Sequence, residues 1–293
     1  MRKILLFAGI VIFLSSCTTI EIREDDLFDV KRTIDVQTFS NTPYEIEELR
    51  ILTPDSIALE AWYITNPEAK FTVLYFGGNG FVLETSYHII MSILDQDVNL
   101  LVFNYRGYGK NNGRPSIRGF KKDGLAAYDY LIENLDLASG EIILHGHSLG
   151  TFIATNTSNQ RKSKALVLQN PVTDMKDWTE TAIPWLLRSF LNFEVDSTLL
   201  KNSNLEQIAR VTEPLFIVAG SEDKITPPEL AKKLYDAAEN TSNKEIMIVD
   251  KGDHNNLPEI GSYNKALGSF YSLQRESSRP SVTGNDGQLN FTH

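Results

Sequence analysis

The spacing of apolar residues along the chain predicts strands at first and then an alternation of strands and helices. Strand-like runs cover residues 33–39, 46–52 and 57–64, and the last two are separated by a Thr-Pro-Asp-Ser sequence at 53–56 that is typical of a hairpin turn. From residue 71 on, short apolar runs of the buried-strand type alternate with segments of helical period. This order predicts an α/β fold, with a mostly parallel central sheet and helices on both faces.

The elements expected in the alternating part have definite bounds. Its strands are 71–76, 100–104, 142–145, 165–169, 214–219 and 245–249. Its helices are 82–94, 117–135, 150–159, 228–238 and 258–273. Because parallel sheets of this kind carry their sites at the carboxyl ends of the strands, the residues just past each strand are the first to consider for chemistry.

The N-terminal segment has the features of a targeting signal. Met1-Arg2-Lys3 is basic, an apolar run follows to Leu14, and two serines precede Cys17, the only cysteine of the chain. This order resembles a bacterial lipobox, in which the cysteine is lipidated and becomes the mature N-terminus, and the apolar run is short for a membrane span. We expect residues 1–16 to be a lipoprotein signal peptide; an ordinary secretory signal or a membrane anchor is the alternative.

This interpretation also predicts where the protein is found and how its ends behave. We expect residues 17–32 to form a tether from the lipid to the fold, in the cell envelope of a bacterium. Thr18 rather than Asp follows the cysteine, which favours the outer membrane over the inner one. Residues 276–293 are polar and rich in Ser, Gly and Asn, and we expect a disordered tail there.

Composition excludes several classes of function. The chain has 293 residues, 42% of them hydrophobic and 23% charged, which is typical of a globular protein. The net charge is −10 and the basic residues form no cluster, so we expect no nucleic-acid partner, because phosphate binding needs concentrated Lys and Arg. The sequence shows no Cys/His metal cluster and no Walker loop, so we expect no cofactor and no metal.

The strongest candidate for chemistry is the sequence Gly146-His147-Ser148-Leu149-Gly150, directly after an apolar strand. A Gly-x-Ser-x-Gly sequence between a strand and a helix is the pattern of a nucleophile elbow, where small residues let the chain reverse sharply. The reversal raises the Ser148 hydroxyl above the sheet edge. The N-terminus of the following helix then offers backbone N–H groups to a developing oxyanion.

A serine nucleophile needs a base and a carboxylate that orients the base. Asp223 lies just past a late strand and is the natural acid, with Glu222 as the alternative. His254 follows the last strand, and the only other histidine downstream of Ser148 is His293 in the polar tail. We therefore predict a catalytic triad of Ser148, Asp223 and His254.

An oxyanion hole needs two backbone donors. We assign one to Leu149, directly after the nucleophile, and the other to Asn79 in the glycine-rich loop 76–80, with Gly80 as the alternative donor. A plain glycine-rich turn is the simpler interpretation of that loop. His147 is given no catalytic role and is interpreted as a packing or positioning residue.

These motifs together resemble a known family. The resemblance rests on the sequences LYFGGNG (74–80), NYRGYGKNNGRPS (104–116), GHSLG (146–150), GSEDKITP (220–227) and GDHNN (252–256). The chain resembles α/β-hydrolases of the serine aminopeptidase S33 type, in the BEM46-like branch, over roughly 35–275. The resemblance implies a hydrolase domain at 33–275, in which the Arg-Gly-Tyr-Gly marker from Arg106 shapes the loop beside the nucleophile. Many relatives have His-Gly where Gly77-Gly78 stands here, which limits the transfer of substrate preference.

The expected function is that of a serine hydrolase that cleaves ester or acyl-thioester bonds of a small-molecule or lipid-like acyl substrate. A peptidase or aminopeptidase of the same fold, and a non-catalytic surface lipoprotein that uses the fold as a binding module, are the alternatives. Residues 171–212 interrupt the alternation and are expected to form a small helical cap insertion. Its apolar residues either line an acyl pocket or belong to helices that pack between strands: Trp178, Pro184, Trp185, Leu186, Leu187, Phe190, Leu191 and Phe193.

Overall fold

The computed structural model describes residues 18–22, 24, 28, 30, 42–174, 191–195, 202–241 and 243–276. Several predictions lie outside the described residues: the signal segment with Cys17, the strand 33–39, the tail from 277 on, and the apolar positions of the insertion from Trp178 to Phe190.

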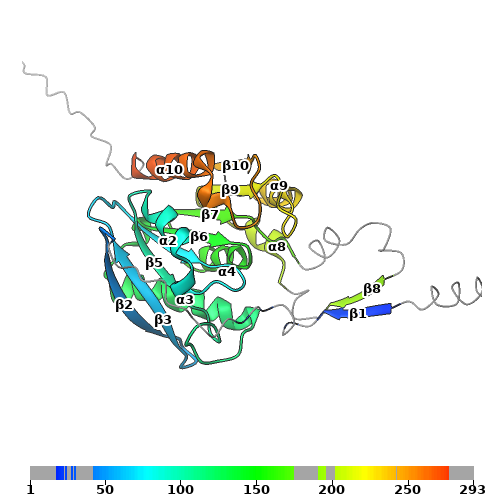
Figure 1. Ribbon diagram of the computed structural model, residues 1–293, viewed down its shortest axis with the longest axis horizontal. Coiled ribbons are helices and arrows are strands. Elements are labelled where there is room, and N and C mark those ends of the chain that lie inside the picture. The colour runs from blue at the N-terminus through cyan, green and yellow to red at the C-terminus, as the bar shows by residue number, and fades with distance from the viewer. Residues whose placement is uncertain are drawn as a thin grey trace, which may run out of the picture.

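An eight-stranded sheet forms the centre of the fold, in the order β10-β9-β7-β6-β4-β5-β3-β2 (Figure 1). Its strands are β2 (Glu45–Leu52), β3 (Ala58–Thr65), β4 (Thr72–Phe76), β5 (Asn99–Phe103), β6 (Ile142–His147), β7 (Ala165–Gln169), β9 (Leu215–Gly220) and β10 (Lys244–Val249). β3 pairs antiparallel with both β2 and β5, and the remaining neighbours are parallel. The predicted mostly parallel α/β sheet is confirmed, and so is its hairpin, where the Ser56 N–H donates to the Thr53 carbonyl at 2.9 Å.

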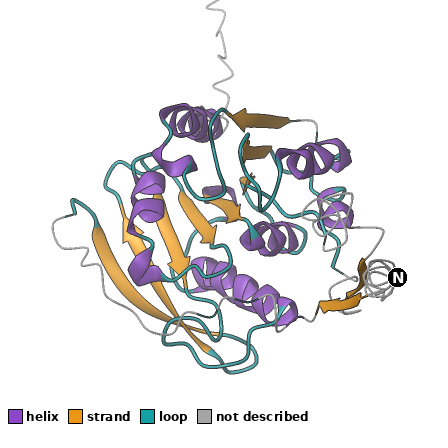
Figure 2. Ribbon diagram, turned by 45° about the vertical axis from the view of Figure 1, so that its right-hand side comes forward, coloured by secondary structure: helices purple, strands orange, loops and turns teal. Residues whose placement is uncertain are grey.

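Helices cover both faces of the sheet, as Figure 2 shows in purple around the orange strands. They are α2 (Tyr87–Leu94), α3 (Ile117–Glu133), α4 (Leu149–Ser158), α8 (Asn204–Ile208), α9 (Pro228–Ala237) and α10 (Gly261–Glu276). Alternate residues of each buried strand belong to different cores: Leu74 and Phe76 of β4 pack with α3 and α4, whereas Val73 and Tyr75 pack with α2 and α10. Because successive residues of a strand point to opposite faces and both faces are buried, the sequence of each central strand is a continuous apolar run.

The predicted helix 82–94 is wrong in one respect, because the structure divides it. A 3-10 turn, η2 (Leu83–Thr85), comes first, and α2 begins at Tyr87. The Leu83 N–H donates to the side chain of Asn104 at 2.9 Å, and the Ser86 hydroxyl donates to the Val82 carbonyl at 2.7 Å. These side-chain bonds compete with the helical pattern, which the apolar period alone does not reveal. The last helix is divided in the same way, with η4 (Leu257–Glu259) ahead of α10.

A second, two-stranded sheet lies outside the main one (Figure 1). β1 (Thr18–Ile22) pairs in parallel with β8 (Leu191–Val195), and Thr18 is in register with Leu191. The sequence predicts a tether at the first segment and a helical cap at the second, and it predicts neither strand. Both five-residue segments contain an alternation of polar and apolar residues, which is compatible with a strand. A strand also needs a partner strand, however, and each of these two segments has its partner far away in the sequence.

A buried ion network fixes the loop between β5 and α3. The Arg106 guanidinium donates to Asp123 at 2.7 and 2.9 Å and to Asp55 at 2.9 and 3.0 Å. The Asp123 side chain is fully buried and that of Arg106 is 8% exposed. Asp55 belongs to the β2–β3 hairpin, so one guanidinium joins the hairpin, the loop and α3.

We expect Asp123→Asn to lower the free energy of unfolding by about 2 kcal/mol, because it removes the buried carboxylate and leaves Asp55 alone to neutralise the Arg106 guanidinium. Urea denaturation at pH 7 measures this. The matched control is Asp129→Asn, which removes an Arg161 partner from an ion pair whose side chains are 38% and 34% exposed. Such a pair contributes at most about 1 kcal/mol, so equal losses in the two variants would contradict the assignment.

Candidate active site

Ser148 lies at a sharp reversal between β6 and α4. Its backbone has φ 52° and ψ −118°, a conformation that residues with a side chain rarely adopt. The two flanking glycines permit the reversal: a Cβ on Gly146 would lie 2.6 Å from the Gly150 carbonyl oxygen, and one on Gly150 would lie 2.0 Å from the Phe76 carbonyl oxygen. Close backbone packing on both sides therefore maintains the strained conformation of Ser148, as a nucleophile elbow requires.

The structure brings the three predicted triad residues together. His254 Nε2 lies 2.9 Å from Ser148 Oγ, and His254 Nδ1 lies 2.8 Å from Asp223 Oδ2. Glu222, the alternative acid, is exposed, whereas Asp223 is buried. The order of contacts, hydroxyl to imidazole to carboxylate, is the one that lets a serine lose its proton.

Asp223 is held as an anion that faces the imidazole. Its Oδ1 accepts the N–H groups of Ile225 and Thr226 at 2.8 Å each, and its Oδ2 accepts the Thr226 hydroxyl at 2.8 Å. Burial of Asp223 acts against ionisation, but the hydrogen bonds from His254 and Thr226 hold the pKa of its carboxyl below the usual value. A carboxylate fixed by several donors can accept a hydrogen bond from His254 Nδ1–H and set the orientation of the ring.

Asn170 is a positioning residue that sequence reasoning missed. It is fully buried just past β7, with a positive φ of 46° that Asn tolerates better than most residues. Its Oδ1 accepts the Gly220 N–H at 2.9 Å, and its amide donates to the carbonyls of Asp253 and His254 at 3.1 and 2.9 Å. Its place at the carboxyl end of a strand beside the elbow was the signal that could have found it. Thr226, also missed, has its hydroxyl oxygen 3.1 Å from the Asn170 carbonyl.

His147 supports the loop that carries the base. Its Nε2 lies 2.9 Å from the His254 carbonyl, and its ring centroid is 5.1 Å from that of His254. Burial, followed by the nearby His254, lowers the pKa of His147 to about 4, so the ring is neutral and Nε2–H donates. This contact agrees with the positioning role expected for it. His145 lies apart from the triad, with Nδ1 3.0 Å from the Tyr271 hydroxyl.

The glycine-rich loop after β4 lies directly beside the nucleophile. A Cβ on Gly78 would be 2.9 Å from His147 Nδ1 and 3.3 Å from Ser148 Cβ. The next residue, Asn79, accepts a hydrogen bond from the Tyr108 hydroxyl at 2.8 Å. On the other side, Leu149 is the first residue of α4, where N–H groups have no acceptor within the helix. The two predicted donors thus belong to segments that meet at Ser148, and their role stays a prediction.

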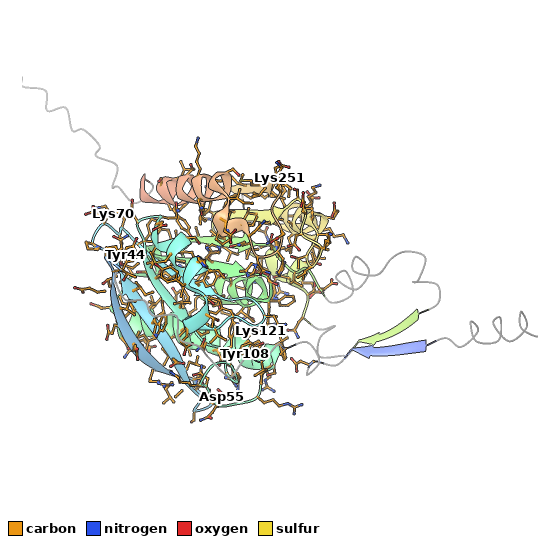
Figure 3. The ribbon with its side chains drawn as sticks, viewed as in Figure 1. Tyr44, Asp55, Lys70, Tyr108, Lys121 and Lys251 are labelled. Atoms are coloured by element: carbon orange, nitrogen blue, oxygen red, sulfur yellow. The ribbon has the colours of Figure 1, made fainter. Side chains whose placement is uncertain are left out.

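Tyr108 connects the Arg-Gly-Tyr-Gly marker to this loop. Its ring is fully buried and packs against Phe120 and Tyr105, with centroids 5.8 and 6.4 Å apart. Gly107 and Gly109, on either side, have φ of 78° and 54°. Figure 3 labels Tyr108 on the same side of the molecule as Asp55, which the Arg106 network fixes.

Among the described residues, no group of three or more His, Cys, Asp or Glu could hold a metal ion. In the same part of the chain, no helix is long and apolar enough to cross a membrane.

Comparison with known proteins identifies the family. The model of the prolyl oligopeptidase family matches residues 85–266. The chain belongs to this family. An uncharacterized protein of Mycobacterium tuberculosis is 33% identical over 211 residues, which cover 71% of this chain and 72% of that one. Protein bem46 of Schizosaccharomyces pombe is 29% identical over 240 residues, 78% of this chain and 77% of its own length. The finer assignment to the serine aminopeptidase S33 type stays a prediction.

Solved structures show the same fold. An esterase from Pyrococcus furiosus superposes with a TM-score of 0.68 at 20% identity, over 84% of this chain and 97% of that one. A puromycin hydrolase superposes with a TM-score of 0.62 at 16% identity, over 82% of this chain and 41% of that one. The α/β-hydrolase fold is thereby shown, and family and fold together support a hydrolase.

The buried neutral His147 predicts a pH dependence of stability. Its folded pKa of about 4 lies below the unfolded value near 6.5, so the unfolded chain binds a proton that the folded chain does not. Its contribution is complete above pH 6.5 and is lost as the pH falls from there towards 4. Between pH 7 and pH 5 the loss is about 2 kcal/mol, and His147→Gln should remove it. Urea denaturation of both proteins at the two pH values measures the difference, and an unchanged pH dependence in the variant would contradict it.

Proposed function

We propose that the protein is a serine hydrolase that cleaves ester or acyl-thioester bonds through an acyl-enzyme intermediate. The observation that carries the proposal is the chain of hydrogen bonds at the elbow. Ser148 Oγ lies 2.9 Å from His254 Nε2, and His254 Nδ1 lies 2.8 Å from Asp223 Oδ2, while the serine backbone is strained. A non-catalytic binding module has no use for a strained backbone that aims a hydroxyl at an imidazole.

The reaction follows from the positions of these groups. Ser148 Oγ attacks the substrate carbonyl while His254 Nε2 takes its proton, and Asp223 holds the ring through Nδ1 and stabilises the imidazolium. The N–H groups of Leu149 and Asn79 bind the oxyanion of the tetrahedral intermediate. His254 then gives its proton to the leaving group. Water repeats the sequence on the acyl-enzyme and releases the acid.

The preference for acyl esters rests on the apolar character of the 171–212 insertion. The base of this insertion lies beside the elbow, because the Val172 N–H donates to Thr151 Oγ1, in the first turn of α4, at 3.3 Å. A segment rich in apolar residues that begins beside the nucleophile suits an acyl chain better than a charged group. The lipoprotein interpretation adds a site of action, the bacterial cell envelope, with Cys17 as the point of attachment and the outer membrane favoured.

A peptidase remains the second candidate, and one feature favours it. A cleft of about 480 Å³ beside His254 is lined by three carboxylates, Glu222, Asp253 and Glu259, and by one cation, Lys224. Carboxylates next to the base would attract the free amine of a peptide or amino-acid amide. Family membership agrees with either reaction, since both proceed by acyl transfer.

Covalent labelling by a fluorophosphonate probe tests the proposal. We expect the purified protein to be labelled, and Ser148→Ala and His254→Ala to lose labelling, because the nucleophile and its base act as a unit. A series of 4-methylumbelliferyl esters of increasing chain length, run beside an aminoacyl amide, then separates esterase from peptidase. A folded wild-type protein that stays unlabelled would refute the hydrolase proposal.

The hydrogen bond from Tyr108 to Asn79 predicts a kinetic effect. Tyr108→Phe keeps the buried ring but removes the hydrogen bond to Asn79 Oδ1, so the oxyanion donor is less well positioned. We expect kcat for a soluble ester to fall about tenfold while KM changes less than about twofold, because the donor acts mainly on the transition state.

The control is Tyr128→Phe, which removes another tyrosine hydroxyl, one that donates to the Lys162 carbonyl away from the elbow. Both variants lose one neutral hydrogen bond, worth about 1 kcal/mol of stability. If both variants lose kcat equally, the effect is one of stability and the positioning role of Tyr108 is refuted.

A further inference from the structure

The start of the described chain docks at the edge of the sheet that carries the triad. The Glu24 carboxylate accepts the Ile117 N–H at 2.7 Å, at the first residue of α3. Phe28 packs edge-on against Phe120 of the same helix, with ring centroids 5.0 Å apart. Because α3 follows the carboxyl end of β5 by one loop, its N-terminus lies at the carboxyl edge of the sheet, where Ser148 and His254 lie.

The same N-terminal segment is joined to the insertion. β1 pairs with β8 over all five residues of each strand. The base of the insertion is closed by Asn204, whose N–H donates to the Thr173 carbonyl and whose amide donates to the Val172 carbonyl, both at 2.8 Å. Val172 in turn contacts the first turn of α4. The N-terminal segment, the insertion and the elbow therefore share one edge of the molecule.

Chain length limits how far Cys17 can be from this edge. β1 begins at the residue after Cys17, and Glu24 is the seventh residue after it. Seven residues span at most about 25 Å when fully extended. A lipid on Cys17 would be inserted in a bilayer, so the N-terminus of α3 and the triad edge would be held near the membrane surface.

We propose that the catalytic edge faces the membrane to which Cys17 is attached, and that the substrate is an acyl ester resident in that bilayer. The substrate clause rests on the proposed hydrolase function, and the orientation rests on lipidation of Cys17. Ile225, two residues from Asp223, is 48% exposed and adds an apolar group at this edge. With a net charge of −10, the protein gains nothing from anionic headgroups, so the anchor rather than surface charge sets the orientation.

Orientation is measured without turnover. The full chain is processed in a bacterial host, purified with its lipid and reconstituted on the outside of phosphatidylcholine vesicles that contain an acceptor-labelled lipid. A donor dye is attached at Arg118→Cys or at Glu133→Cys, two exposed positions at opposite ends of α3. Fifteen residues of helix separate the two dyes by about 22 Å.

We expect energy transfer to the bilayer to be stronger from position 118 than from position 133. Equal transfer, or stronger transfer from 133, overturns the proposed orientation. Mass spectrometry of the purified chain gives the state of Cys17, and an unmodified cysteine overturns the proposal as well.

Turnover then tests the substrate. A flexible Gly-Ser linker of twenty residues inserted between Cys17 and Thr18 keeps the lipid but releases the catalytic edge from the surface. We expect hydrolysis of 4-methylumbelliferyl palmitate in the vesicles to fall about fivefold or more, because the effective concentration at the surface drops. Hydrolysis of the soluble acetate ester should change less than about twofold.

A second variant releases the segment in another way. Glu24→Ala together with Phe28→Ala removes both contacts with α3 and should reproduce the selective loss on the bilayer ester. Equal rates of wild type and both variants on the bilayer ester, with the soluble ester still cleaved, overturn the membrane-facing site and leave the hydrolase intact. No cleavage of either ester by the wild type refutes the hydrolase function itself, and the bilayer substrate with it.

Discussion

The close contact between the end of β4 and the start of α4 is the constraint on which the site depends. Only a glycine fits at position 150, because a Cβ there would lie 2.0 Å from the Phe76 carbonyl oxygen. The contact presses the loop that continues from Phe76 against the elbow, so that Gly78 lies beside Ser148. A single steric requirement therefore sets the backbone of the nucleophile and the position of the loop proposed to bind the oxyanion.

Buried amide side chains organise the loops around this contact. Asn104, just past β5, accepts the Leu83 N–H and donates to Glu60, while Asn170, just past β7, joins the ends of β7 and β9 to the loop of His254. Both are fully buried. Hydrogen bonds in such an environment are strong and costly to break, so each amide fixes loops that would otherwise have many conformations. The loop that carries the base is held in place by the Asn170 bonds rather than by regular secondary structure.

The fold is common to the family, whereas the loops determine the surroundings of the site. The solved structures share this fold, but at identities of 14 to 21% they bear on architecture alone. Three features shape the surroundings of the site: the Gly-Gly loop, the Tyr108 contact to Asn79, and the N-terminal segment that reaches the insertion through β1. Each of these acts on the surroundings of Ser148 rather than on the triad itself.

Local sequence determined most of the elements and named the residues that meet at the site. Buried strands are apolar throughout, the hairpin has a turn sequence, and the elbow needs glycines on both sides of Ser148, so each is visible in a short stretch. The positions of Asp223 and His254 followed from the order of strands. What only the tertiary structure decided depends on partners far apart in the chain: the pairing of β1 with β8, the break before α2 caused by Asn104, and the contacts of Asn170 and Thr226 that hold the base. A hydrogen bond across twenty or more residues leaves no local pattern, because either partner alone is an ordinary polar residue.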